Sequence, residues 1–267
     1  MLRPTLQDLG FGLRTLRSAP WFSLVTVLTL ALGIGASVAM FSVLHAVYIR
    51  PLPFPEADRL VVGRTTVQGQ LNPWATGADY YDYRDQAQGF SELAAVLPFP
   101  VDLTVSGGGE AERVSGNVTS PNLFAALRAP TAMGRPFLPE EGLEGAGNVV
   151  LLSHGFWQRR LGGDPGAIGS TITLDGSPYT VVGILPPDFF FMTPAELWLP
   201  MRPDRYAAAS RDMHNWYMVG RLESGWTLDE VQAGVNVVAA RLREAYPETN
   251  RDKGLLLTGL REVLTED

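Results

Sequence analysis

The sequence predicts an α+β fold in which one N-terminal membrane-spanning helix is followed by a domain with a β-rich insertion. Three observations support this fold class. Residues 18–49 contain no Asp, Glu, Lys or Arg. Strand–helix–strand patterns open the remaining region at 60–99 and close it at 216–260. A β-rich segment of about 90 residues separates the two patterns, which is typical of an α+β domain that carries an insertion.

The charge-free segment is long enough to cross a bilayer. As a helix, residues 22–48 would measure roughly 40 Å, whereas the hydrocarbon core requires only about 20 residues. We therefore expect a transmembrane helix at 21–50. A cleaved signal peptide is the alternative, because Ser37-Val38-Ala39 has the small-x-small form of a cleavage site. A retained anchor is favoured, since the sequence stays apolar from residue 40 to residue 49.

The distribution of charge predicts the topology. Arg3, Arg14 and Arg17 precede the span with a single acid, Asp8, and such positive charge keeps this end in the cytoplasm. Residues 51–267 would then lie outside the cytoplasm, anchored in the cell (inner) membrane. They carry 17 basic and 27 acidic residues, a net charge of −10. This acidic balance excludes nucleic acid as a partner, because phosphate binding requires a basic surface.

Residues 1–20 predict a cytoplasmic amphipathic helix. Leucines spaced three and four residues apart share one face of it, namely Leu2, Leu6, Leu9, Leu13 and Leu16. With arginines beside them, the helix is typical of one that lies on a membrane surface. Two roles remain open for this helix. It is either a simple interfacial anchor or a docking element for a cytoplasmic partner through Leu6, Leu9, Leu13 and Leu16.

Hydrophobic patterning predicts the elements that follow the span, where prolines at 51, 53 and 55 prevent the helix from continuing. Strands are expected at 60–67, 93–99, 101–105, 113–118, 149–152, 171–174, 179–185, 216–222 and 255–260. Helices are expected at 75–86, from Ser120-Pro121 onward, at 155–161 and at 228–246. In the last helix, Thr227 and Glu230 have the spacing of a capping box.

No set of residues predicts catalytic chemistry. The chain has no Cys, which excludes disulfides and thiol chemistry, and it lacks the GxxxxGK[ST] loop of an ATPase. The histidines His45, His154 and His214 lack the paired spacing of a zinc site. We therefore predict no enzyme activity and no metal or cofactor in this chain. The acidic pair Glu140 and Glu141 is expected to be solvated.

The membrane segment contains small residues at a helical spacing. Ala31, Gly35 and Ala39 are four residues apart, and so are Gly33 and Ser37. Small residues in such rows let helices approach closely, so we predict that these five positions pack against partner helices. The alternative is that Gly and Ala are simply tolerated in a membrane.

Several separated motifs resemble those of MacB-type (FtsX-like) ABC-transporter permeases. LALGIGASVAMFSV at 30–43 and RPLPFPEADRL at 50–60 resemble the first membrane helix of that family and the segment after it. The family's periplasmic core domain is similar in GRPF at 134–137, VLLSHGFWQRRLGGDP at 150–165 and VVGILPPDF at 181–189. The motifs occur in the expected order across essentially the whole chain.

The resemblance implies a split architecture. A porter-like α+β subdomain would comprise 51–120 and 212–267, and a β-rich inserted subdomain would comprise 121–211. It also implies a permease that is not itself an enzyme and that relays the cycle of a cytoplasmic ATP-binding subunit to the outer domain. ATP is then expected only on that partner. Further partners would be the membrane and either the remaining permease helices or a second permease copy.

The sequence departs from this family in one respect. Family members have four membrane helices, three of them after the outer domain, whereas nothing past residue 50 is apolar enough to span. We therefore expect a truncated permease or the first part of a split one. The alternative function is a membrane-tethered extracytoplasmic binding or signalling module. An anchored hydrolase is a third possibility, which no triad or metal set supports.

Overall fold

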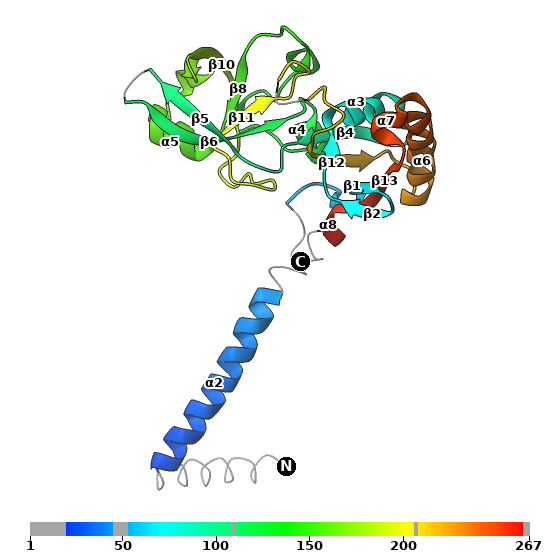
Figure 1. The fold of residues 1–267 in the computed structure, drawn as a ribbon. Coiled ribbons are helices and arrows are strands. Elements are labelled where there is room, and N and C mark those ends of the chain that lie inside the picture. Colours follow the sequence, from blue (N-terminus) through cyan, green and yellow to red (C-terminus); the bar gives the residue numbers. More distant parts are fainter. Residues whose placement is uncertain (1–19, 45–52, 108–109, 206–207, 264–267) are drawn as a thin grey trace. The chain divides into compact units, whose positions relative to one another are not determined.

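The computed structural model describes residues 20–44, 53–107, 110–205 and 208–263 (Figure 1). The chain divides into two compact units, Met1–Pro51 and Leu52–Asp267. The first contains the helix α2, and the second contains the α+β domain. This confirms the predicted fold class, a mixed helix and strand domain that follows one N-terminal apolar helix.

Helix α2 (Pro20–Leu44) is apolar on all sides and contains no charged residue. Within the described ranges, its Pro20–Val38 portion is the one helix long and apolar enough to cross a membrane, and none of that portion is buried against the rest of the protein. A helix that is apolar all round and exposed all round is suited to lipid or to partner helices. The expected continuation of the span to residue 50 lies outside the described residues.

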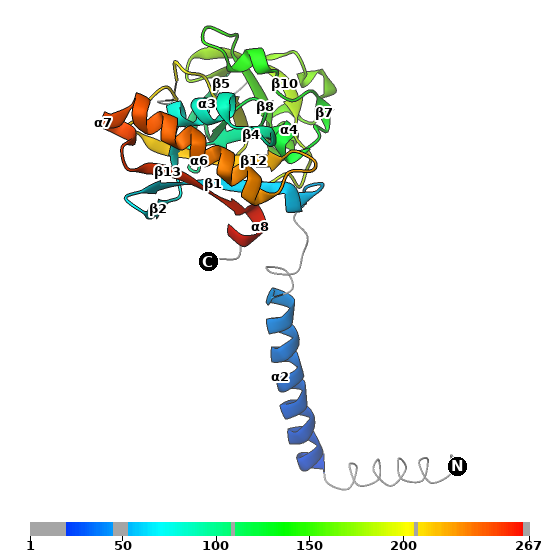
Figure 2. The ribbon, with the colours of Figure 1, turned by 90° about the vertical axis from the view of Figure 1, so that its right-hand side faces the viewer.

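One half of the domain is a four-stranded antiparallel sheet with helices on one face. Its strands follow the order β4-β12-β1-β13. The elements in chain order are β1 (Leu60–Val67), α3 (Gly77–Gln86), β4 (Phe90–Val96), β12 (His214–Leu222), α6 (Leu228–Ala245) and β13 (Lys253–Gly259). Figure 2 shows α3, α6 and the short α7 (Pro247–Asn250) covering this sheet. This order is that of a β-α-β-β-α-β, ferredoxin-like unit, interrupted between its second and third strands.

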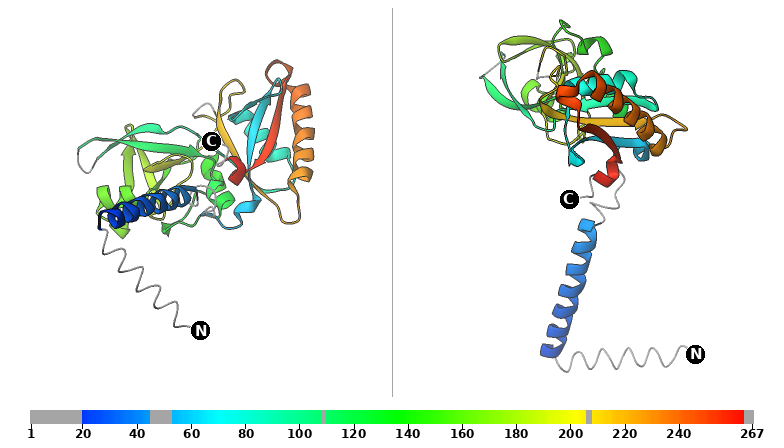
Figure 3. Two further views of the ribbon diagram at one scale, coloured as in Figure 1. Left: turned by 90° about the horizontal axis from the view of Figure 1, so that it is seen from below. Right: turned by 45° about the vertical axis from the view of Figure 1, so that its right-hand side comes forward.

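The other half is a closed circuit of strands, visible beside the sheet in Figure 3. The pairing runs β11-β8-β10-β9-β5-β6, and β6 then pairs with β11 to close the ring. Its strands are β5 (Val101–Ser106), β6 (Glu112–Thr119), β8 (Val149–Leu152), β9 (Thr171–Leu174), β10 (Ser177–Ile184) and β11 (Leu197–Pro200), with helix α5 at His154–Leu161. Closure satisfies the backbone groups that an open edge would leave unpaired.

Shorter elements complete the domain. They are η2 (Ala57–Arg59), β2 (Gln70–Asn72), β3 (Ala75–Thr76), α4 (Leu123–Leu127), β7 (Met133–Gly134), η3 (Pro139–Gly142), η4 (Pro165–Ala167) and α8 (Leu260–Val263). Strand β4 of the sheet meets β6 of the ring, where Val96 pairs with Thr119 and Leu97 N donates to Val118 O (2.8 Å). The predicted subdomain limits at 120/121 and 211/212 stay predictions, and β5 and β6 are hydrogen-bonded within the ring.

Most predicted elements are confirmed, and two helix starts are wrong. The helix expected at 75–86 begins at Gly77, because Ala75–Thr76 form strand β3 and Thr76 caps the helix. The predicted Ser120-Pro121 start is two residues early, because α4 begins at Leu123 after Asn122. The Ser120 hydroxyl accepts a hydrogen bond from Ala95 N (2.9 Å) and donates one to Asn122 Oδ1 (2.8 Å). Ser120 therefore fastens β4 to the start of α4 instead of capping the helix.

Two apolar cores support the domain. One lies under α3 and α6 and extends into the ring of strands, where Trp216, Phe156 and Leu174 are buried. The second lies on the opposite face of the sheet and surrounds α4, with Phe124, Trp198 and Leu260 at its centre. Because α4 occupies this second core, both faces of the central strands are covered.

A side chain from α6 closes the edge of the sheet. Strand β13 ends the strand order, and the Gln232 amide bonds to its backbone: Nε2 donates to Leu255 O (2.9 Å), and Leu257 N donates to Oε1 (2.7 Å). This pair of bonds imitates a neighbouring strand. An edge that is occupied in this way is a poor template for pairing with another chain.

We expect Gln232→Ala to lower the free energy of unfolding by about 1–2 kcal/mol, because two backbone groups at the edge lose their partners. Chemical denaturation of the full chain measures this change. Gln158→Ala, at an exposed glutamine of α5, is the matched control and should change stability little. Equal effects of both substitutions would contradict a special role for Gln232.

Candidate functional site

The predicted helix-packing residues all lie in α2. Ala31, Gly33, Gly35 and Ser37 are exposed, and a Cβ built at Gly33 or Gly35 meets nothing within 4 Å. At about 100° per residue, the 31/35/39 row and the 33/37 row lie on opposite sides of the helix. The helix can therefore receive a close neighbour on two sides. The predicted docking leucines, Leu6, Leu9, Leu13 and Leu16, lie outside the described residues.

A buried arginine holds the segment that leads into the domain. Arg221 of β12 is 1% exposed, and its guanidinium donates to three backbone carbonyls: Ala126 O at 2.6 Å, Glu56 O at 3.0 Å and Pro55 O at 3.0 Å. Burial lowers the pKa of Arg221, and the neighbouring Arg128 lowers it further. The side chain therefore joins β12, the end of α4 and the first residues of the domain at one point.

Three more charged residues complete this neck clamp, which we define as Glu56, Arg59, Arg128 and Arg221. Glu56 forms ion pairs with Arg59 (2.6 Å) and with Arg128. The hydrogen bonds from Arg128 and then Arg59 lower the pKa of the Glu56 carboxyl. Arg59 also donates twice to the carbonyl of Leu222, at 3.0 and 2.6 Å. The segment that follows the span is thereby fixed to the central strand of the sheet.

The last described helix, α8, lies beside η2 and β1. Leu260 of α8 is buried in the same core as Leu60, and Ala57 and Val263 pack against that core. The two ends of the domain are therefore neighbours.

A second ionic cluster joins the ring's return segment to the sheet. Asp79 of α3 is 4% exposed, and its Oδ1 accepts from Arg211 (2.9 Å) and Asn250 (2.8 Å). The Lys253 ammonium lies 3.5 Å from Oδ2, and Arg211 also pairs with Asp82 at 2.6 Å. The cluster holds the segment before β12 against α3.

One predicted solvated acid is buried. Glu141 is 8% exposed, whereas Glu140 is exposed as expected. The Glu141 carboxylate pairs with Arg135 (2.6 Å) and accepts from Leu138 N (2.7 Å). The prediction was wrong for Glu141. Its carboxylate can be buried because hydrogen bonds from Arg135 and Leu138 replace those that water would make.

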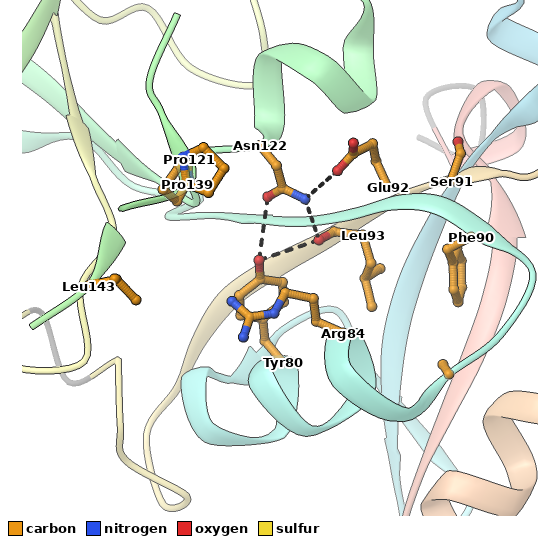
Figure 4. A pocket seen from close by; sticks show the side chains of 11 residues that line it. Tyr80, Arg84, Phe90, Ser91, Glu92, Leu93, Pro121, Asn122, Pro139 and Leu143 are labelled. Carbon is orange, nitrogen blue, oxygen red and sulfur yellow. Dashed lines mark hydrogen bonds between the residues drawn. The ribbon is translucent and has the colours of Figure 1, made fainter. Parts of the chain in front are cut away.

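A cleft of about 480 Å³ lies between α3 and β4 on one side and residues between 121 and 143 on the other (Figure 4). We call it the junction cleft. It is lined by Tyr80, Arg84, Ala87, Phe90, Ser91, Glu92, Leu93, Pro121, Asn122, Pro139 and Leu143. Asn122 organises its rear wall, since its amide donates to Glu92 (2.8 Å) and to Leu93 O (3.0 Å). None of these residues was predicted, because α3, β4, α4 and η3 meet only in the folded domain.

The described residues contain no group of three or more His, Cys, Asp or Glu that could hold a metal ion. His154 packs edge-on against Trp157, at 5.3 Å between ring centres. His214 lies near the Asp79 cluster, and its Nε2 is buried without a hydrogen-bond partner. These two histidines occupy different halves of the domain, in α5 and β12.

The fold and the neck clamp define a class: a membrane protein whose α+β domain follows an apolar helix. The chain belongs to the MacB-like periplasmic core domain family, whose profile matches residues 23–238. This confirms the resemblance that the sequence motifs indicated. The family is a domain of ABC-transporter permeases, so the protein is a membrane protein with an extracytoplasmic segment. No curated protein matches the sequence.

Two solved structures share the fold. A domain described as a permease protein from Porphyromonas gingivalis aligns with a TM-score of 0.59 at 15% identity, over 78% of this chain and 93% of that one. The periplasmic region of MacB from Actinobacillus actinomycetemcomitans aligns with a TM-score of 0.54 at 8% identity, over 78% and 91%. At these identities the likeness concerns the fold alone.

Acidification below pH 6.5 should destabilise the domain through His214. Burial lowers the pKa of His214 below its ordinary value of 6.5, and the Lys253 charge lowers it further. His214 then binds a proton more readily in the unfolded chain than in the folded one. Its effect on the free energy of unfolding is therefore absent above pH 6.5, and that free energy falls as the pH drops below 6.5. Thermal unfolding between pH 7.5 and 5 measures this loss.

His214→Gln should flatten that pH profile, whereas His154→Gln should leave it unchanged. Glu56 and Glu230, with pKa values lowered from 4.5, contribute only to losses at more acidic pH. A slope that persists in His214→Gln would assign the acid sensitivity to another group.

Proposed function

We propose that this protein is a permease component of a MacB-like ABC transporter, in which a separate cytoplasmic ATPase drives export or envelope transport. The family match supports the class of transporter. The neck clamp supports the relay, because three hydrogen bonds from Arg221 attach the segment after the span to the sheet. A displacement that reaches residues 55 and 56 would be passed to β12 through these bonds.

The topology belongs to the same proposal. The N-terminus faces the cytoplasm, residues 51–267 lie outside it, and the membrane is the cell's inner membrane. The surplus of arginine before α2 supports this orientation. The neighbouring ends of the domain support its placement between membrane segments, with further permease helices or a second permease copy beside α2. The two rows of small residues on α2 provide two sides for such contacts.

Cysteine accessibility tests the topology, and the absence of native Cys makes each introduced thiol unique. Asn236→Cys, on the exposed face of α6, should react with a membrane-impermeant maleimide in intact spheroplasts. Gln7→Cys should react only after the membrane is permeabilised. The reverse labelling pattern would invert the proposed orientation.

Arg221→Met tests the relay. Spin labels at Ile34→Cys and Asn236→Cys of the full chain, assembled with its ATPase, should show a distance change between nucleotide-free and vanadate-trapped states. In Arg221→Met this change should be reduced by about half or more, because the clamp loses its three carbonyl contacts. Arg113→Met, at an arginine whose side chain is 75% exposed on β6, is the matched control.

Glu56→Gln provides a second variant should Arg221→Met not fold, since Glu56 is 47% exposed and holds only the outer part of the clamp. An unchanged distance response in a folded clamp variant would exclude the neck clamp as the relay. Failure of any ATP-binding subunit to assemble with the chain would exclude the permease role itself.

The alternative function, a membrane-tethered binding or signalling module, is favoured by one observation, the junction cleft. Under that alternative the chain would bind its ligand and remain independent of an ATPase. Assembly with an ATP-binding subunit, measured on the detergent-solubilised full chain, distinguishes the two functions.

A further inference from the structure

We propose that the junction cleft binds a small carboxylate with a branched apolar body, either a free acid or the C-terminus of an apolar peptide. The volume of about 480 Å³ is within the range of small-molecule sites. The cleft also lies between the sheet half and the segment that follows β6, with walls from both. This binding does not depend on the proposed relay.

Arg84 provides the cation that would recognise the carboxylate. Its Nε donates to Asp85 Oδ1 at 2.7 Å, and its guanidinium carbon lies 5.0 Å from the centre of the Tyr81 ring and 5.9 Å from that of Tyr80. These contacts, one of them an ion pair through Nε, hold the guanidinium plane. A guanidinium fixed in this way loses little entropy when its remaining edge takes a carboxylate.

The other charged residue of the lining, Glu92, is hydrogen-bonded to the protein. Glu92 accepts from the Asn122 amide, whose own Oδ1 accepts from Ser120 Oγ at 2.8 Å. This network ties Glu92 to the rear wall, as Figure 4 shows. Glu92 keeps its negative charge in this network, and Arg84 is the one cation of the lining and the group that would select an anionic head.

The opposite wall is apolar and accessible. Pro121, Pro139 and Leu143 lie across from Arg84 in Figure 4, and Leu143 is 61% exposed. A smaller cavity of about 210 Å³ shares these three residues together with Arg84 and is extended by Met201. An isobutyl or similar group would cover the exposed leucine and the prolines, and burying this apolar surface would favour binding.

A matched set of ligands tests the charge requirement by calorimetry on the full chain in detergent. N-acetylleucine, N-acetylleucinamide and leucinamide share one apolar body and carry an anionic, a neutral and a cationic head. We expect N-acetylleucine to bind and the neutral amide to bind at least about tenfold more weakly, because it lacks the charge-assisted bonds to Arg84. Leucinamide should not bind.

A second pair identifies the source of the carboxylate. Tighter binding of Ala-Ala-Ala-Leu than of N-acetylleucine would assign the cleft to peptide C-termini, whereas binding of N-acetylleucine alone would assign it to free acids. The C-terminally amidated tetrapeptide should bind at least tenfold more weakly than the free form in the first case.

Two cleft variants and two controls locate the binding. Arg84→Gln and Leu143→Glu should each weaken N-acetylleucine at least tenfold. Arg113→Gln and Leu71→Glu, at exposed positions outside the lining, should leave its affinity unchanged. Leu143 is a surface residue, so its substitution tests the cleft even if Arg84→Gln fails to fold.

Three results would overturn the proposal. They are equal affinity for the acid and its amide, preference for leucinamide, and absence of N-acetylleucine binding at millimolar concentration. Unchanged affinity in both folded cleft variants would place the binding elsewhere and overturn it equally.

Discussion

The domain depends on one constraint: the chain that leaves the apolar helix must be fastened to the middle of a sheet. Arg221 provides this attachment. Its charged guanidinium donates hydrogen bonds to three backbone carbonyls instead of to a carboxylate. Carbonyl oxygens satisfy the buried guanidinium without adding a second ion to desolvate. Because β12 is central, with β4 on one side and β1 on the other, whatever is fastened to it is fastened to the whole sheet.

The ring of strands is also attached to that sheet by side-chain hydrogen bonds and ion pairs. On the outgoing side, Ser120 binds β4 and the start of α4. Where the chain returns from the ring to the sheet, Asp79 contacts Arg211, Asn250 and Lys253. The junction cleft lies between these attachments. A ligand there would contact α3 and β4 on one side and residues between 121 and 143 on the other.

Local patterns predicted much of this fold, and distant contacts account for what was missed. Strand β8 and the Thr227–Glu230 capping box could be predicted because their signals lie within a few residues. Strand β11 has four residues, ends in proline and pairs with β6 about 80 residues earlier, so no local pattern marks it. Asp79 and Arg221 look like ordinary surface charges in sequence, because the groups that bury them lie far along the chain.

The interrupted sheet also determines the order in which the protein can fold during synthesis. Leu60 pairs with Arg221, and Val67 pairs with Lys253. Strand β1 therefore cannot enter the sheet until the last quarter of the chain has been synthesised. The ring of strands needs only residues up to Pro200 and can close earlier. Until β12 and β13 are made, the apolar strand β1 can pair only with the short β2, and contacts of such long sequence separation form slowly. The nascent protein therefore passes through a stage in which the inserted ring is complete while the sheet that will bear it is still open.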